Sequence, residues 1–141
     1  MLELQKKYCL TNQPLKVIID QVGSPKNTYS LANLFWEIIR PNKLERSKTL
    51  IFHWIHSGLA IWYYFAEVIG KLLLRNGLIS RVTYVIPILS KNFKLKASRP
   101  KYSFLNSYQT KIFFNIKSSH WRDELKKILK KPVLTSSNKI K

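Results

Sequence analysis

Residues 57–89 decide the fold, and they read SGLAIWYYFAEVIGKLLLRNGLISRVTYVIPIL. Apolar residues recur at helical spacing up to Leu73, and Asn76 and Gly77 supply a left-handed stop for that helix. Beyond the glycine the apolar spacing changes to an alternating one, and the β-branched residues predict a strand over 79–89. A helix that runs into a strand predicts a protein of the α+β class.

A helix and a strand are also predicted before this stretch. Apolar residues recur at helical spacing over 31–39, Asn27 or Ser30 can cap the start of this helix, and Pro41 prevents it from continuing past Arg40. Residues 49–55 are rich in β-favouring side chains and predict a short buried strand. Residues 1–26 have no clear periodicity and are interpreted as an extension that closes on a turn.

The remaining residues predict a second, strand-rich part of the chain. Residues 93–97 alternate apolar and basic side chains, so they are expected to pair with 79–89 as a hairpin. A third strand is predicted over 111–117, a short basic helix over 123–130 and a last strand at 133–134. No internal repeat or low-complexity tract interrupts this order.

The predicted organisation has three parts. They are an N-terminal extension (1–26), an N-terminal α/β lobe of helix, strand, helix and hairpin (27–90), and a small basic β-rich C-terminal lobe (91–141). The chain has a net charge of +18, and the last part holds 14 of the 25 basic residues but two of the seven acidic ones. Such an excess predicts a polyanionic partner, with nucleic acid favoured over an anionic membrane surface. The 45% apolar content excludes a disordered basic tail.

Three local matches, in the right order, carry a resemblance to a known family. The first is the predicted helix that ends at Arg40, and the second is the helix that ends in the sequence Asn-Gly-Leu-Ile at 76–79. The third is Asp-Glu-Leu at 123–125, followed by Thr-Ser-Ser-Asn-Lys-Ile at 135–140. The chain resembles the bacterial-type small-subunit ribosomal protein S-eight family, in an organellar form that stops at Lys141 before the family's last strand.

This resemblance implies a structural constituent of the small ribosomal subunit that binds the central domain of its rRNA and contributes to assembly and translation. It implies neighbouring ribosomal proteins as partners, and either loss of the last strand or a separate chain that completes the C-terminal sheet. It also implies a mitochondrial ribosome and an organelle-encoded protein. The RNA contacts it implies are Arg40, Asn42, Lys43, Lys94, Lys96, Lys117, Arg122, Lys130, Lys131, Thr135, Ser136, Ser137, Asn138 and Lys139.

Plainer interpretations of the same residues stay open. The hydroxyl-rich end can be a frayed polar tail, and Lys94 and Lys96 can be the solvent face of an edge strand. Residues 51–74 are almost continuously apolar, so a single-pass subunit of an organellar membrane complex is the alternative function. Glu67 and Lys71 within that run argue against a membrane span.

The sequence offers no catalytic constellation. Asp123 and Glu124 are adjacent, so on a helix they point about 100° apart and cannot act together as an acid/base pair. Their position favours an interaction with the dipole at the N-terminus of a helix. The three histidines lack the spacing of a metal site, and the four glycines form no phosphate-binding loop. We therefore expect a protein without enzymatic activity, cofactor, metal or small-molecule substrate.

Overall fold

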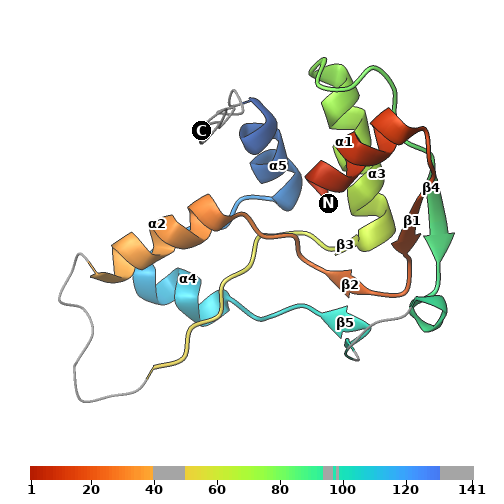
Figure 1. Ribbon diagram of the computed structural model, residues 1–141. Coiled ribbons are helices and arrows are strands. Elements are labelled where there is room, and N and C mark those ends of the chain that lie inside the picture. The colour runs from red at the N-terminus through yellow and green to blue at the C-terminus, as the bar shows by residue number, and fades with distance from the viewer. Residues whose placement is uncertain (40–49, 94–96, 98, 131–141) are drawn as a thin grey trace, which may run out of the picture.

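The computed structural model describes residues 1–39, 50–93, 97 and 99–130, and it mixes helices with short strands (Figure 1). The helices are α1 (Leu2–Thr11), α2 (Thr28–Ile39), α3 (Trp62–Arg75), α4 (Tyr108–Phe114) and α5 (Trp121–Lys130). The strands are β1 (Leu15–Ile18), β2 (Val22–Gly23), β3 (Ala60–Ile61), β4 (Val85–Ile88) and β5 (Tyr102–Ser103), and one 3-10 turn, η1, covers Ser90–Asn92.

The described strands form two small sheets. In the first, β1 and β4 run parallel, with Leu15 opposite Val85. In the second, β2 lies between β3, to which it is antiparallel, and β5, to which it is parallel. Gly23 of β2 lies opposite Ser103 of β5, and a Cβ on Gly23 would lie 2.9 Å from the Ser103 Oγ. The glycine therefore lets the carboxyl ends of these two parallel strands approach closely.

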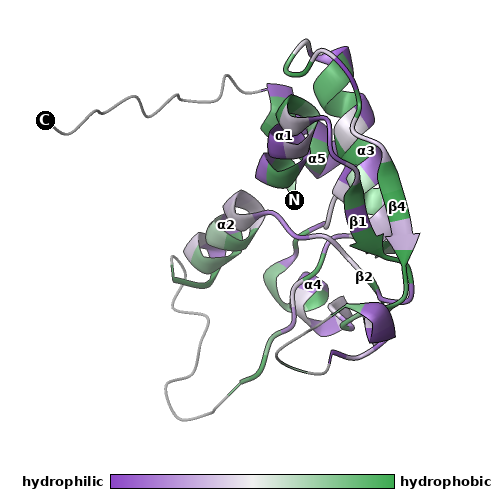
Figure 2. Cartoon of the chain, turned by 45° about the vertical axis from the view of Figure 1, so that its right-hand side comes forward, coloured by the Kyte–Doolittle hydropathy of each residue, from purple (hydrophilic) through white to green (hydrophobic). Residues whose placement is uncertain are grey.

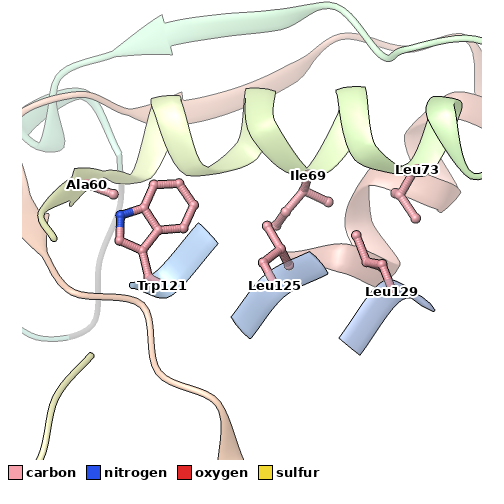
Figure 3. Close-up of a cluster of buried hydrophobic side chains, with 6 residues drawn as sticks. All are labelled: Ala60, Ile69, Leu73, Trp121, Leu125 and Leu129. Atoms are coloured by element: carbon pink, nitrogen blue, oxygen red, sulfur yellow. The ribbon is translucent and has the colours of Figure 1, made fainter. Parts of the chain in front are cut away.

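The main hydrophobic core lies between α3 and α5. Its buried side chains come from both helices and from β3: Ala60, Ile69, Leu73, Trp121, Leu125 and Leu129. Figure 3 shows the α5 side chains pointing toward the α3 side chains along the two helices. The α5 members recur every four residues, as do the α3 members, so each helix presents one apolar stripe to the other.

A second core cluster joins the first sheet to α3. Leu15, Val17 and Val85 pack with Ala66 of α3, which is fully buried. From α1, the buried Gln5 donates its Nε2 hydrogen to the Ala66 carbonyl oxygen at 3.0 Å. Residues 1–26 thus contribute α1, β1 and β2 to the packed structure, although the sequence analysis predicted no helix or strand there. The division of the chain at 26 and 90 stays a prediction.

Three predicted helices are confirmed, with shifted starts. They are the helix before Pro41, which is α2, the helix before Gly77, which is α3, and the basic helix, which is α5. Ser30 donates its backbone N–H to the Asn27 Oδ1 at 3.1 Å, so Asn27 caps α2 as the sequence analysis allowed.

Two predicted strands are wrong, and a third is shorter than predicted. Residues 50–56 form neither helix nor strand in the structure, and no neighbouring described strand pairs with them. The strand predicted over 79–89 is confirmed in part, as the shorter β4, which pairs in parallel with β1. The predicted hairpin partner, 93–97, lies mostly outside the described residues. The strand predicted over 111–117 is replaced by α4, because Phe114 is buried and Asn115 ends a helix in the left-handed conformation. Residues 94–96 and the strand predicted at 133–134 lie outside the described residues.

Candidate functional site

The described residues form two clefts that border the turn from β2 to α2. The larger, of about 580 Å³, lies between α2 and α5, and we call it the α2–α5 cleft. The smaller, of about 260 Å³, lies where β2 and β5 end, and we call it the Trp62 cleft. The Trp62 cleft is lined by Gly23, Ser24, Pro25, Lys26, Ala60, Ile61, Trp62, Phe65, Ser103 and Leu105.

A buried chain of polar side chains occupies the wall of the α2–α5 cleft. The Asn27 Nδ2 donates to the Glu124 Oε2 at 2.6 Å, and the Lys127 Nζ donates to the other carboxylate oxygen of Glu124, also at 2.6 Å. Burial raises the pKa of the Glu124 carboxyl, but the hydrogen bonds from Lys127 and Ser119 and the charges of Lys127 and His56 together outweigh it, so the pKa lies below its ordinary value. Glu124 is therefore an anion that is already paired.

His56 completes this network and is almost fully buried, with 2% of its surface exposed. Its Nε2 lies 3.3 Å from the backbone nitrogen of Asn27 and 2.9 Å from the Ser30 Oγ. Burial lowers the pKa of His56, and the Glu124 carboxylate offsets only part of that effect. A neutral His56 can accept the Asn27 N–H, and it thereby holds the first residues of α2 in place.

The lining of the α2–α5 cleft holds charges of both signs: Glu37, Glu124, Lys117, Lys127 and Lys130. One of these pairs, Lys127 with Glu124, is already formed. The cleft's buried polar groups on Asn27, Ser30 and Glu124 already bond to one another. The network is better explained as the support that positions the turn from β2 to α2.

The Trp62 cleft has the chemistry of a ligand site. Trp62 and Phe65 give it an aromatic wall, with ring centroids 6.1 Å apart in an edge-on arrangement, and Trp62 is 39% exposed. The exposed Lys26 is among the residues that line the cleft. Ser24 donates its hydroxyl to the His56 carbonyl oxygen at 2.7 Å, so the buried network also fixes the loop that borders this cleft.

The position of the Trp62 cleft in the fold agrees with this chemistry. It lies beyond the carboxyl ends of the parallel strands β2 and β5, which is where α/β proteins commonly bind their ligands. An aromatic face can stack on a base or on the apolar side of a sugar, and an ammonium can pair with phosphate oxygens. The cleft therefore suits a ligand that joins a flat or ring-shaped apolar part to a phosphate.

Of the residues that the sequence analysis proposed for RNA contact, the structure describes three: Lys117, Arg122 and Lys130. Lys117 and Lys130 line the α2–α5 cleft, whereas the Arg122 guanidinium lies over the rings of Tyr64 and Trp121, at 5.0 and 5.3 Å from their centroids. The other proposed residues lie outside the described residues: Arg40, Asn42, Lys43, Lys94, Lys96, Lys131, Thr135, Ser136, Ser137, Asn138 and Lys139.

The sequence analysis missed the Trp62 cleft. Its signal in the sequence was the Gly-Ser-Pro turn at 23–25, which was interpreted as the end of an extension. Trp62 was counted with the apolar face of a helix, because helical spacing does not show which aromatic residue will border a cleft.

Comparison with known proteins shows which family the chain belongs to. The family model described as the RmlD substrate binding domain matches residues 1–133. The chain belongs to this family. It is 33% identical over 127 residues to the spore coat polysaccharide biosynthesis protein SpsK of Bacillus subtilis, covering 90% of the chain and 40% of that protein. It is 25% identical over 137 residues to the dTDP-4-dehydrorhamnose reductase of Salmonella typhimurium, covering 97% of the chain and 44% of that enzyme.

Solved structures of RmlD-type proteins have a similar fold. A dTDP-4-dehydrorhamnose reductase from Clostridium acetobutylicum is 29% identical with a TM-score of 0.71, over 90% of this chain and 41% of that one. The Bacillus anthracis reductase in complex with NADP has a TM-score of 0.73 at 20% identity, over 90% of this chain and 41% of that one, and its likeness concerns the fold alone. The chain spans about two fifths of the length of the curated relatives it matches.

The family match overturns the ribosomal interpretation. The resemblance to ribosomal protein S-eight is wrong, and with it the structural role in the small subunit, rRNA and ribosomal proteins as partners, and the mitochondrial ribosome as location. The expectation of a protein without enzymatic activity is also wrong, because the family and its relatives point to reductases. The three ribosomal matches were short helix ends and turns, whereas the RmlD match runs through 133 residues.

The alternative of a membrane subunit is wrong for the same reason. None of the helices in residues 1–39, 50–93 and 99–130 combines the length and the hydropathy that a membrane span needs. The apolar run at 51–74 is divided between an irregular segment, β3 and all but the last residue of α3.

The described residues do not fit the dinucleotide that the Bacillus anthracis structure contains. A dinucleotide pyrophosphate needs a glycine-rich turn between a strand and a helix. The glycines of this sequence are Gly23, Gly58, Gly70 and Gly77, and no two have Gly-x-Gly spacing. The turn from β2 to α2 has one glycine and a proline, so we assign no cofactor step to this part of the fold.

Proposed function

We propose that the chain binds a nucleotide-linked sugar in the Trp62 cleft, as the substrate-binding part of an RmlD-type reductase. The observation that carries this proposal is the RmlD substrate binding domain match over residues 1–133, joined to an aromatic cleft with a lysine in its lining. The relative from Salmonella typhimurium is named for a dTDP-linked sugar, which has a base, two phosphates and a sugar ring.

Each part of such a ligand has a complementary group in the cleft. The Trp62 ring offers a stacking face for the base or the sugar, and Phe65 supports that ring from the next turn of α3. Lys26, which lines the cleft, supplies an ammonium group that can pair with the diphosphate. The loop at 23–26 is held by the buried network, so little ordering entropy is lost on binding. The reduction itself would require the dinucleotide-binding part of the enzyme.

Titration of the purified chain with dTDP-glucose, followed by calorimetry, tests the proposal. Trp62→Ala should weaken binding by about tenfold or more, because stacking of one base on an aromatic ring contributes about 1–3 kcal/mol. The matched control is Trp36→Ala, which removes an exposed tryptophan from α2, outside the cleft, and should leave the affinity unchanged.

Two results would contradict this function. Absence of dTDP-glucose binding by a folded wild-type chain would refute it directly. An equal loss of affinity in the Trp62 and Trp36 variants would remove the ligand from the Trp62 cleft. Thymidine, which lacks the phosphates, should bind more weakly than dTDP if Lys26 has the proposed role.

A further inference from the structure

The turn that leads from β2 to α2 is held on both sides of Lys26 by one residue, His56. Before Lys26, the Ser24 hydroxyl donates to the His56 carbonyl oxygen at 2.7 Å. After it, the backbone N–H of Asn27 donates to the His56 Nε2 at 3.3 Å. That N–H belongs to the planar peptide bond between Lys26 and Asn27. His56 therefore fixes the backbone on both sides of a lysine that lines the Trp62 cleft.

His56 is itself fixed in the fold by the residue that follows it. Ser57 donates its backbone N–H to the Ser119 carbonyl oxygen at 3.1 Å, and its own carbonyl oxygen accepts the Trp121 N–H at 3.1 Å. These bonds join the segment that carries His56 to the start of α5, where Trp121 belongs to the main core. Figures 1 and 2 show α2 on the opposite side of the molecule from β1 and β4, with the turn at 24–27 leading to it from β2. The position of this turn thus depends on a residue that is anchored to the core.

The His56 ring has two possible hydrogen-bond arrangements around its Nε2. When the ring is neutral and Nε2 carries no hydrogen, this nitrogen accepts the Asn27 N–H. When the ring is protonated, Nε2 carries a hydrogen and can donate it to the Ser30 Oγ, which lies 2.9 Å away and itself donates to the Asn27 carbonyl oxygen. The Asn27 N–H, on a residue with 8% of its surface exposed, then loses its acceptor. An unpaired buried N–H is costly, so protonation favours a shift of the turn.

We infer that His56 is a pH-sensitive positioning residue for the Trp62 cleft: the neutral ring holds Lys26 in place for a phosphate-bearing ligand, and the protonated ring releases the turn. This inference rests on the proposed function, in which the cleft binds a nucleotide-linked sugar. His56 is not among the residues that line the cleft, so it acts through Ser24 and Asn27. Lysine ammonium groups keep their charge between about pH 5 and 8. A loss of affinity in this range therefore reports the position of the turn and not the charge of Lys26.

The groups around His56 set the direction of its titration. From α5, the Glu124 carboxylate favours the protonated ring and the Lys127 ammonium disfavours it. The Ser119 backbone also favours the protonated ring, whereas the groups at the start of α2 and the Trp54 ring, which lies edge-on with its centroid 6.4 Å away, are neutral. Burial is the largest effect and lowers the pKa of His56 below its ordinary 6.5. The ring is thus neutral above about pH 6.5 and takes up its proton as the pH falls below that value.

Calorimetric titration of the full chain with dTDP-glucose, over a series from about pH 8 to about pH 5, tests the inference. The lower limit keeps Glu124 ionised, because the pKa of its carboxyl lies below the ordinary 4.5. Each phosphate of this ligand is esterified at both ends, so the ligand keeps its charge throughout the series. The wild type should lose affinity by about fivefold across it, which corresponds to about one hydrogen bond. Circular dichroism at each pH checks that the chain is still folded.

Two substitutions at position 56 distinguish titration of the ring from a merely structural role. His56→Gln keeps an acceptor for the Asn27 N–H but takes up no proton, so its affinity should stay near the high-pH value of the wild type across the whole series. His56→Leu has no acceptor, so it should bind about fivefold more weakly at every pH. His53→Gln is the matched control, because His53 is exposed and this variant should keep the wild-type pH profile.

Failure of this inference can be distinguished from failure of the proposed function. A wild-type affinity that does not change with pH would overturn the role of His56, and so would a His56→Gln variant whose affinity falls as steeply as that of the wild type. Absence of dTDP-glucose binding at every pH would instead refute the function.

The positioning role can also be measured without a ligand. The backbone amide NMR signals of Lys26 and Asn27 should move with pH in the wild type, with a midpoint below about 6.5, because their peptide bond is held by the His56 ring. In the His56→Gln variant the same signals should stay in place. Wild-type signals that do not respond to pH would overturn the inference whatever the cleft binds.

Discussion

At the scale of single residues, His56 links the stability of the fold to pH. Its ring accepts the Asn27 N–H while neutral, and burial lowers its pKa below the ordinary 6.5. The unfolded chain therefore takes up a proton more readily than the folded one as the pH falls. The stabilising contribution of neutral His56 is fully present above about pH 6.5 and is lost as the pH falls toward the lower pKa of the folded state.

Urea unfolding at about pH 7.5 and about pH 5.5 measures this effect. The wild type should lose more stability between these values than a His56→Gln variant, which cannot take up the proton. His53→Gln is the control, because His53 is exposed and should leave the wild-type pH dependence intact. A His56→Gln variant with the same slope as the wild type would exclude His56 as its source. The lowered pKa of Glu124 acts in a more acidic range, below about its ordinary 4.5.

The residue scale also shows what the sequence could predict of the site. Asn27 was predicted as a possible cap of α2, and its Oδ1 accepts the Ser30 N–H. Its second partner, Glu124, lies 97 positions away in the chain. Glu124 was assigned to the dipole of a helix, because nothing in the sequence near it indicates a buried amide. Local capping is visible from a sequence, whereas a polar pair between distant segments requires the fold.

At the scale of elements, α3 is the helix on which both core clusters depend. Leu73 is fully buried between α3 and α5, whereas its neighbour Leu74 is 43% exposed. Leu73→Ala should lower the free energy of unfolding by about 2–5 kcal/mol through lost burial and a cavity. Leu74→Ala, the matched control on the same helix, should change it by less than about 1 kcal/mol. If urea unfolding showed the same loss of stability in both variants, Leu73 would not be buried between α3 and α5.

Elements with long helical periodicity were predictable, and short apolar runs were not. The α3 helix has a sustained apolar stripe and a glycine stop, so its period and its end could both be predicted. The run at 111–117 is too short for its spacing to distinguish a helix from a strand. Burial of Phe114 favours the helix, α4. Residues 50–56 have the composition of a strand, but they pair with no described strand.

At the scale of the whole molecule, the net charge of +18 sets a dependence on salt. Self-repulsion destabilises a compact chain, and salt screens it over a Debye length of about 10 Å at 0.1 M. The midpoint of thermal unfolding should therefore rise as NaCl increases from a few millimolar. Lys16→Glu with Lys71→Glu, both at exposed positions, should make that rise smaller. The charge-preserving pair Lys16→Arg with Lys71→Arg should behave like the wild type, and a midpoint that falls with salt would contradict the argument.

The prediction of function from the sequence was wrong at the scale of the whole molecule, because it relied on the net charge and on short motif matches. An excess of basic residues indicates that a ligand is negatively charged, but it does not indicate the size of the ligand. It therefore could not distinguish a polynucleotide from a sugar diphosphate. Short colinear matches then favoured the ribosomal family, although each covered only a helix end or a turn. A match over residues 1–133 constrains the core, both sheets and the turn beside the Trp62 cleft at once.

The parallel pairing of β1 with β4 has a consequence for biosynthesis. The two strands lie roughly 70 positions apart in the chain, so their contact raises the relative contact order and slows folding. At a translation rate of about 5–20 residues per second, β1 leaves the exit tunnel roughly 4–14 s before its partner. During that interval the nascent segment has an unprotected edge, and chaperones that bind extended apolar peptides have time to engage it before the first sheet can close.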